Sequence, residues 1–139
     1  MKNLIIISLL VVMGCSTKPA PKDVVFDFIA AVRNSDTTRV VQILDIDTYV
    51  KGRMGAMSPA DSATILAAYR DSTMQALLGE GEVRDRWTKW QIVVNKEIKQ
   101  DTLAEVEVSF IDRMRGFQLY TKIQLEKQGD GTWRIIRFR

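Results

Sequence analysis

The sequence predicts an α+β fold in which about three helices come first and pack on a four-stranded antiparallel sheet. Two observations predict it. Apolar residues recur with the helical period of about 3.6 before Trp87 and with the strand period of 2 after it. Turn sequences at residues 113–116 and 128–131 then separate successive alternating segments, as in a meander. With 139 residues, 46% of them hydrophobic, the chain can form one domain with a core.

Three segments before Trp87 have helical spacing. The first covers residues 23–34, and Asp36 is placed to cap a second, short helix that ends at about Leu44. Ser58 and Pro59 start a third helix as its N-cap and first residue. The residues expected to face the core from these helices are Val24, Val25, Phe28, Ile29, Val32, Val40, Val41, Leu44, Ile65, Leu66, Tyr69, Ala76 and Leu77.

Three later segments alternate between apolar and polar residues, which is the pattern of a strand with one buried face. A fourth strand is expected over Thr132–Arg139, where the buried face stays open because Ile135 and Ile136 are adjacent. The inward-facing residues of the other three strands are Trp90, Ile92, Val94, Ala104, Val106, Val108, Phe110, Phe117, Leu119, Thr121, Ile123 and Leu125.

The charged side chains predict the register of the middle hairpin. A loop at residues 113–116 pairs Glu107 with Lys122. Shifting the register by two residues would instead set Glu105 against Glu126. Like charges directly opposite each other destabilise a sheet by up to about 1 kcal/mol, so the first register is predicted.

The N-terminal residues have the pattern of a signal peptide. Lys2 is followed by Leu4–Met13, which is apolar except for Ser8 and shorter than the roughly 20 residues that span a bilayer. It ends in Val12-Met13-Gly14-Cys15, which resembles the lipobox cut by the lipoprotein signal peptidase. The resemblance implies that residues 1–14 are removed and that Cys15, the only cysteine, carries a lipid anchor in the membrane.

Residues 15–22 are interpreted as the lipidated cysteine and a polar tether, and residues 23–139 as the domain. Pro19 and Pro21 within the tether favour an extended chain. The protein is therefore expected to be exported and lipid-anchored. Ser16 is not the aspartate that resembles an inner-membrane retention signal, so a Gram-negative cell would hold the protein at the outer membrane, facing the periplasm.

Composition excludes several classes of function. The formal net charge is +3, and removing Lys2 with the leader leaves +2, which predicts no strong attraction to nucleic acid. The chain has no histidine, the commonest general base and zinc ligand. With one cysteine it can form no internal disulfide. We expect no metal and no cofactor.

Two segments of the chain form a recognisable pattern, DVVFDFIAAVRNSDTTRVVQIL at residues 23–44 and GDGTWRIIRF at residues 129–138. Together with the order of helices and strands behind a lipobox, they resemble the NTF2-like (cystatin-like) superfamily, and most of all its small lipoprotein branch. The resemblance implies a curved sheet around a cone-shaped pocket that the first helices close. Many members have a strand between the second and third helices, and this sequence shows no clear one there.

The residues expected at such a pocket are Phe28, Tyr69, Phe110 and Asp112. Asp112 keeps the phase of the inward face of its strand, and family enzymes place acids and tyrosines in the cone. A buried aspartate has a raised pKa and can act as a base. The favoured alternative is that Asp112 ends its strand and faces water at the hairpin. No set of nucleophile, base and orienting residue is visible, so no catalytic residue is assigned.

Other patterns have simpler structural interpretations. Asp45 and Asp47 are too few for a metal site, and Asp47 fits a turn cap better. Gly79–Glu82 is a connector rather than a phosphate loop, and Arg115–Phe117 matches only the start of an RNA-binding strand. Basic and aromatic residues alternate over residues 84–90 as in nucleic-acid or lipid-headgroup binders, but a tryptophan-anchored junction between helix and strand is favoured.

The expected function is a lipid-anchored, non-enzymatic accessory or binding module that holds a small apolar ligand or an envelope protein. Two alternatives stay open. One is a metal-independent enzyme that uses a pocket aspartate and tyrosine. The other is a protein-interaction module of an envelope complex that uses the exposed face of the sheet, because a fold alone does not separate these functions. The ligand and the oligomeric state are not predicted.

Overall fold

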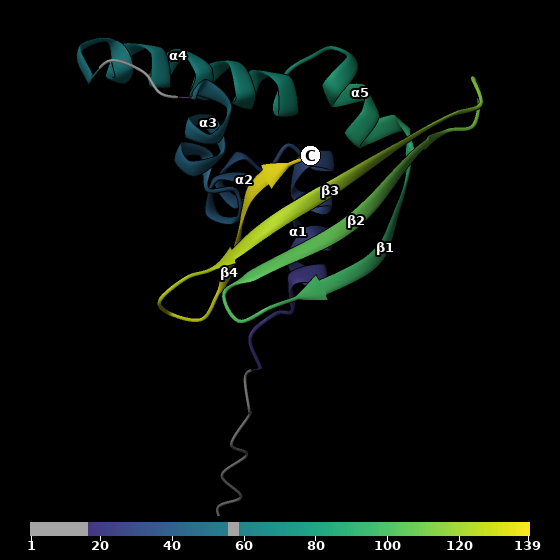
Figure 1. Cartoon of the computed structure of the whole chain (residues 1–139). Coiled ribbons are helices and arrows are strands. Elements are labelled where there is room, and N and C mark those ends of the chain that lie inside the picture. The colour runs from purple at the N-terminus through teal and green to yellow at the C-terminus, as the bar shows by residue number, and fades with distance from the viewer. Residues whose placement is uncertain (1–16, 56–58) are drawn as a thin grey trace, which may run out of the picture.

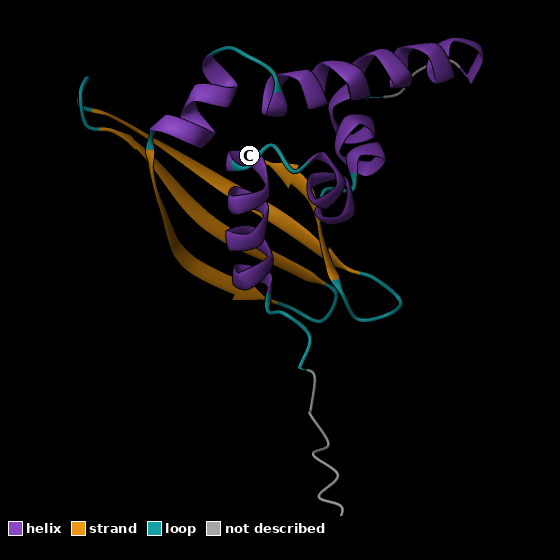
Figure 2. Ribbon diagram, turned by 180° about the vertical axis from the view of Figure 1, so that it is seen from behind, coloured by secondary structure: helices purple, strands orange, loops and turns teal. Residues whose placement is uncertain are grey.

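The computed structural model describes residues 17–55 and 59–139, and the side chains of residues 59–61 are left aside. Within this part, five helices precede one antiparallel sheet with strand order β1-β2-β3-β4 (Figure 1). The helices are α1 (Pro21–Arg33), α2 (Thr37–Ile43), α3 (Ile46–Met54), α4 (Pro59–Leu78) and α5 (Glu82–Lys89). The strands are β1 (Gln91–Lys99), β2 (Leu103–Asp112), β3 (Phe117–Lys127) and β4 (Trp133–Phe138). The helices lie on one side of the sheet (Figure 2).

The α+β class and the four strands are confirmed, but the prediction of about three helices is wrong. Helices α3 and α5 were missed because neither has an apolar stripe of several turns. The buried residues of α3 are the adjacent pair Tyr49 and Val50, and Trp87 is the buried residue of α5. Such short helices are stabilised by tertiary contacts rather than by their own sequence pattern.

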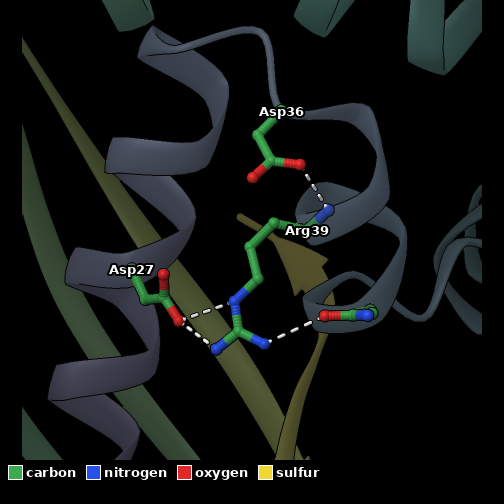
Figure 3. Close-up of polar contacts among 4 residues, drawn as sticks. Asp27, Asp36 and Arg39 are labelled. Carbon is green, nitrogen blue, oxygen red and sulfur yellow. Dashed lines mark hydrogen bonds and ion pairs between the residues drawn. The ribbon is translucent and has the colours of Figure 1, made fainter.

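Helix α1 starts two residues before the predicted position, since Pro21 occupies its first turn. The last two residues of the predicted tether therefore belong to the helix. As predicted, the Oδ1 atom of Asp36 caps α2 by accepting the Arg39 backbone N–H at 2.9 Å. The Arg39 guanidinium in turn bonds the Asp27 carboxylate on α1 and joins the two helices (Figure 3). Ser58, the predicted cap of α4, lies outside the described residues.

The predicted register of the middle hairpin is confirmed, because Glu107 of β2 lies opposite Lys122 of β3. The lysine, however, forms its ion pair with Glu105, at 3.0 Å between Nζ and Oε1. Glu105 itself lies opposite Gln124, so the ion pair is diagonal. On this outer face, Lys122 thus pairs with Glu105, which lies two residues along β2 from the expected partner Glu107.

A register shift in β4 explains why its buried face could not be predicted. Ile135 is fully buried opposite Leu125, and Phe138 lies opposite Ile123. The change of phase between these positions is a β-bulge, which lets residues of odd and even number face the same side. Ile135 also forms a single parallel bridge with Leu44, after α2. This bridge lies between α2 and α4, where the sequence showed no clear strand.

The predicted core is largely confirmed, with exceptions in α2, in α4 and at the hairpin end of β3. Val41 is 46% exposed and Ile43 takes its place in the core. Phe117 and Leu119, at the hairpin end of β3, are also exposed. On α4, Leu77 is buried while Tyr69 is 47% exposed. None of the helices in the described residues has the length and apolar character needed to span a membrane.

Candidate binding cleft

A cleft of about 320 Å³ lies between α3, α4 and α5 on one side and the inner face of the sheet on the other. Helix α4 supplies one wall, and the sheet contributes one residue from each of β2, β3 and β4. The cleft has the size of a small-molecule site, at the lower end of the usual range of about 300–1,000 Å³. Its lining residues are Tyr49, Arg53, Tyr69, Ser72, Thr73, Ala76, Leu77, Val83, Arg86, Trp87, Phe110, Thr121 and Phe138.

The deep wall of the cleft is an aromatic cluster. The Trp87 ring meets the Phe110 ring edge-on, with centroids 4.9 Å apart, and packs at 5.7 Å from Phe138. Tyr49 lies 5.2 Å from Phe138 on the other side. Pairs at these distances stabilise one another beyond the burial of their surfaces. The cluster therefore gives the cleft a rigid apolar base.

Polar groups lie around this base. The hydroxyl of Thr73 donates to the Tyr69 carbonyl at 2.8 Å and so is satisfied within α4. The guanidinium of Arg53 donates to the Tyr49 hydroxyl at 3.1 Å and lies 5.8 Å from the centre of that ring. Arg53 is thus held against the cleft by an aromatic residue rather than by an acid.

Arg86 stands on the wall between this cleft and a second, wider groove. Its Nε atom is buried and has no hydrogen-bond partner among the described residues. Its guanidinium lies 5.7 Å from the centre of the Trp90 ring, a cation–π contact. A buried donor without a partner typically costs about 1–3 kcal/mol. Such a group in a cleft is a reason to look for a ligand that satisfies it.

The second groove has a volume of about 1160 Å³ and lies between α5, the start of β1 and the β2–β3 hairpin. Asp112 lies here, at the end of β2. Its Oδ1 atom accepts the backbone N–H groups of Met114 and Arg115 at 3.0 and 3.2 Å. Its carboxylate therefore closes the hairpin loop, an Asx-type turn.

The structure brings together only two of the four residues expected at the pocket. Tyr69 and Phe110 both line the cleft. Phe28 is fully buried behind it, edge-on to Trp87 with centroids 5.3 Å apart. Asp112 lies in the other groove, although only 12% of its side chain is exposed. The strand phase was read correctly, but β2 carries Asp112 beyond the cleft to the hairpin.

The sequence did not point to Arg53, Arg86 or Phe138 as cleft residues. Arg86 belongs to the basic and aromatic run over residues 84–90, a pattern that is visible in the sequence. The position of the Arg86 side chain, however, depends on helix α5, which was not predicted. Phe138 reaches the cleft through the bulge in β4. Neither position follows from local periodicity.

The paired aspartates after α2 have structural partners. Asp45, rather than Asp47, is the cap, because its Oδ1 and Oδ2 atoms accept the backbone N–H and the hydroxyl of Thr48 at 3.2 and 2.9 Å. Asp47 pairs with Arg70 of α4. In residues 17–55 and 59–139 no cluster of three or more histidine, cysteine, aspartate or glutamate side chains is placed to hold a metal ion.

The fold is similar to that of a solved protein from Shewanella frigidimarina, described as a candidate ketosteroid isomerase. The two are 20% identical with a TM-score of 0.51, over 83% of this chain and 89% of that one. Together with the order of helices and strands, this likeness shows an α+β fold that is consistent with an NTF2-like one. Identity this low shows the fold alone.

Two further solved structures are described as NTF2-like. A candidate NTF2-like transpeptidase from Campylobacter jejuni is 14% identical, with a TM-score of 0.48 over 84% of this chain and 97% of that one. An NTF2-like protein of unknown function from Silicibacter pomeroyi is 15% identical, with a TM-score of 0.47 over 83% and 86%. No protein-family model and no curated protein sequence matches the chain.

Proposed function

We propose that the chain is a lipoprotein whose NTF2-like domain binds a small, largely apolar ligand in the cleft and does not transform it. The aromatic base formed by Trp87, Phe110 and Phe138 is the observation that carries this proposal. Apolar walls with a few polar groups are typical of small-molecule sites. None of the residues that line the cleft is an aspartate, glutamate, cysteine or histidine, the usual bases and nucleophiles.

The anchor at Cys15 is part of the proposal and lies outside the described residues. The start of α1 is at one end of the sheet, and α4, α5 and the β2–β3 hairpin are at the other (Figure 1). The contact between Lys22 and Glu97 holds α1 to the end of β1. An anchor ahead of α1 would leave the cleft end of the domain directed away from the membrane, which supports capture of a ligand from the periplasmic side.

Binding in the cleft is tested by filling it. The full-length protein is reconstituted in lipid nanodiscs and titrated by calorimetry with naphthalene-2-carboxylate, with empty nanodiscs as the blank. Ala76 lines the cleft, so Ala76→Phe should abolish binding. Ala67→Phe is the matched control, because Ala67 is an exposed residue of the same helix. Equal binding by both variants would reject the proposal, because the filled cleft would then not be the binding site.

The anchor is tested separately. Changing Cys15→Ser removes the only thiol that can carry the lipid, so the protein should no longer take up labelled palmitate. Continued labelling of this variant would show that the anchor lies elsewhere.

A further inference from the structure

The charged side chains that line the cleft are all positive. They are Arg53, from α3, and Arg86, from α5, and the remaining lining residues are neutral. An apolar site that holds two cations without a counter-charge favours a negatively charged occupant.

Arg86 is distinguished from the other arginines that bury an unpaired Nε atom. Arg70 and Arg134 also do so, but the Nη2 atom of each is bonded. Arg70 bonds the carboxylate of Asp47, and Arg134 bonds two backbone carbonyls near the end of α2 at 3.0 Å. In the described part of the chain, the Arg86 guanidinium has only the contact with the Trp90 ring. No backbone carbonyl or side-chain oxygen of the described residues therefore engages its N–H donors.

The acids closest to Arg86 along the chain do not neutralise it. Asp85 forms an ion pair with Lys89, at 2.8 Å between Oδ1 and Nζ. Asp85 and Glu82 both line the wider groove and not the cleft. Arg86 lines both hollows, and only the wider groove has acidic residues in its lining as well.

We propose that the ligand of the cleft is a small aromatic or alicyclic carboxylate, an inference that rests on the proposed function and names its ligand class. The apolar body lies on Trp87, Phe110 and Phe138. The carboxylate accepts hydrogen bonds from Arg86, whose planar fork of N–H donors fits two carboxylate oxygens. Arg53, held by Tyr49, adds a second positive charge to the lining of the cleft. A cleft of about 320 Å³ limits the body to one or two fused rings.

The test compares a charged with a neutral probe on the same protein. Naphthalene-2-carboxylate and naphthalene-2-carboxamide have the same ring system and differ in charge. Calorimetry on the full-length protein in nanodiscs should give at least tenfold tighter binding of the carboxylate. Arg86→Gln should reduce the affinity for the carboxylate to that for the carboxamide and leave the carboxamide unchanged. Lys51→Gln, which removes the same charge from an exposed residue of α3, should change neither.

The outcomes separate this inference from the proposed function. Equal affinities for the two probes, both lost in Ala76→Phe, would keep the binding cleft and overturn the carboxylate. A carboxylate preference that survives Arg86→Gln would also overturn it. If neither probe binds, the proposed function fails, and this inference fails with it.

Discussion

Arg33 and Arg84 each donate hydrogen bonds to the C-terminal end of the other's helix. From α1, Arg33 bonds the carbonyls of Trp87 and Trp90 at 3.1 and 3.2 Å, at the end of α5. From α5, Arg84 bonds the carbonyl of Val32, near the end of α1, and that of Leu77, in the last turn of α4, at 3.1 Å. The last carbonyls of a helix have no partner within it and carry partial negative charge, so both cations are well placed. This exchange holds α5 against α1 and so positions the cleft.

Arg84→Lys should destabilise the protein by about 2 kcal/mol, because one ammonium cannot reach the several acceptors that the guanidinium joins. Chemical denaturation of the two proteins measures the difference in the free energy of unfolding. Arg115→Lys is the matched control, since 74% of the Arg115 side chain is exposed and little change is expected. Equal effects of the two substitutions would show that the exchange between α1 and α5 contributes nothing.

Much of the fold could be predicted because its signals are local. The apolar face of α1 and the alternation of the strands are written in consecutive residues, and the register of the hairpin follows from like charges that must be kept apart. Helix α5 has no such signal. Its one buried residue, Trp87, and the bonds of Arg84 depend on α1, which is far away in the sequence.

The cleft was harder to predict than the fold for the same reason. Tyr69 and Phe110 could be named from the faces of their elements. Arg86 and Phe138 could not, because one depends on a helix without an apolar stripe and the other on a bulge that changes the phase of β4. For Asp112, the face of its strand was predicted correctly. The alternation of β2 could not show, however, that the residue lies in the wider groove rather than in the cleft.

Glu105→Gln should remove a small stabilisation that depends on pH. The pKa of Glu105 is lowered from its ordinary 4.5, chiefly by the hydrogen bond from Lys122, and the pKa of Lys122 is raised from 10.5 by the same contact. The stabilisation is therefore present between pH 4.5 and 10.5. It is lost as the pH falls through the lowered pKa of Glu105 or rises through the raised pKa of Lys122. Thermal denaturation of both proteins from pH 7 down to pH 2 should show their difference disappear.

Glu107→Gln is the control for this measurement. Glu107 lies opposite Lys122 in the register, whereas the ion pair is formed with Glu105. We expect the substitution at Glu107 to have the weaker effect. If it had the larger one, the directly opposed pair, and not the diagonal one, would be the stabilising contact in solution.

Phe138→Ala should lower the free energy of unfolding by about 2–4 kcal/mol, because it removes a ring from the aromatic cluster and leaves a cavity. The ring packs against Phe28, Tyr49 and Trp87 at centroid distances of 5.8, 5.2 and 5.7 Å. Denaturant titration provides the measurement. Phe26→Ala makes the same change at a position that is 51% exposed, and its effect should be clearly smaller. Similar losses in the two variants would argue against the packing role of the bulge in β4.

Asp112→Asn should leave stability almost unchanged, whereas Asp112→Ala should lower the free energy of unfolding by about 1 kcal/mol. The amide oxygen of asparagine can still accept the N–H groups of Met114 and Arg115, while alanine leaves both without their acceptor. Chemical denaturation compares the three proteins, and amide NMR shifts of Met114 and Arg115 report on the loop directly. A loss in Asp112→Asn as large as in Asp112→Ala would mean that the negative charge of Asp112 matters, and not its place in the turn, and would reopen the case for a functional carboxylate in the wider groove.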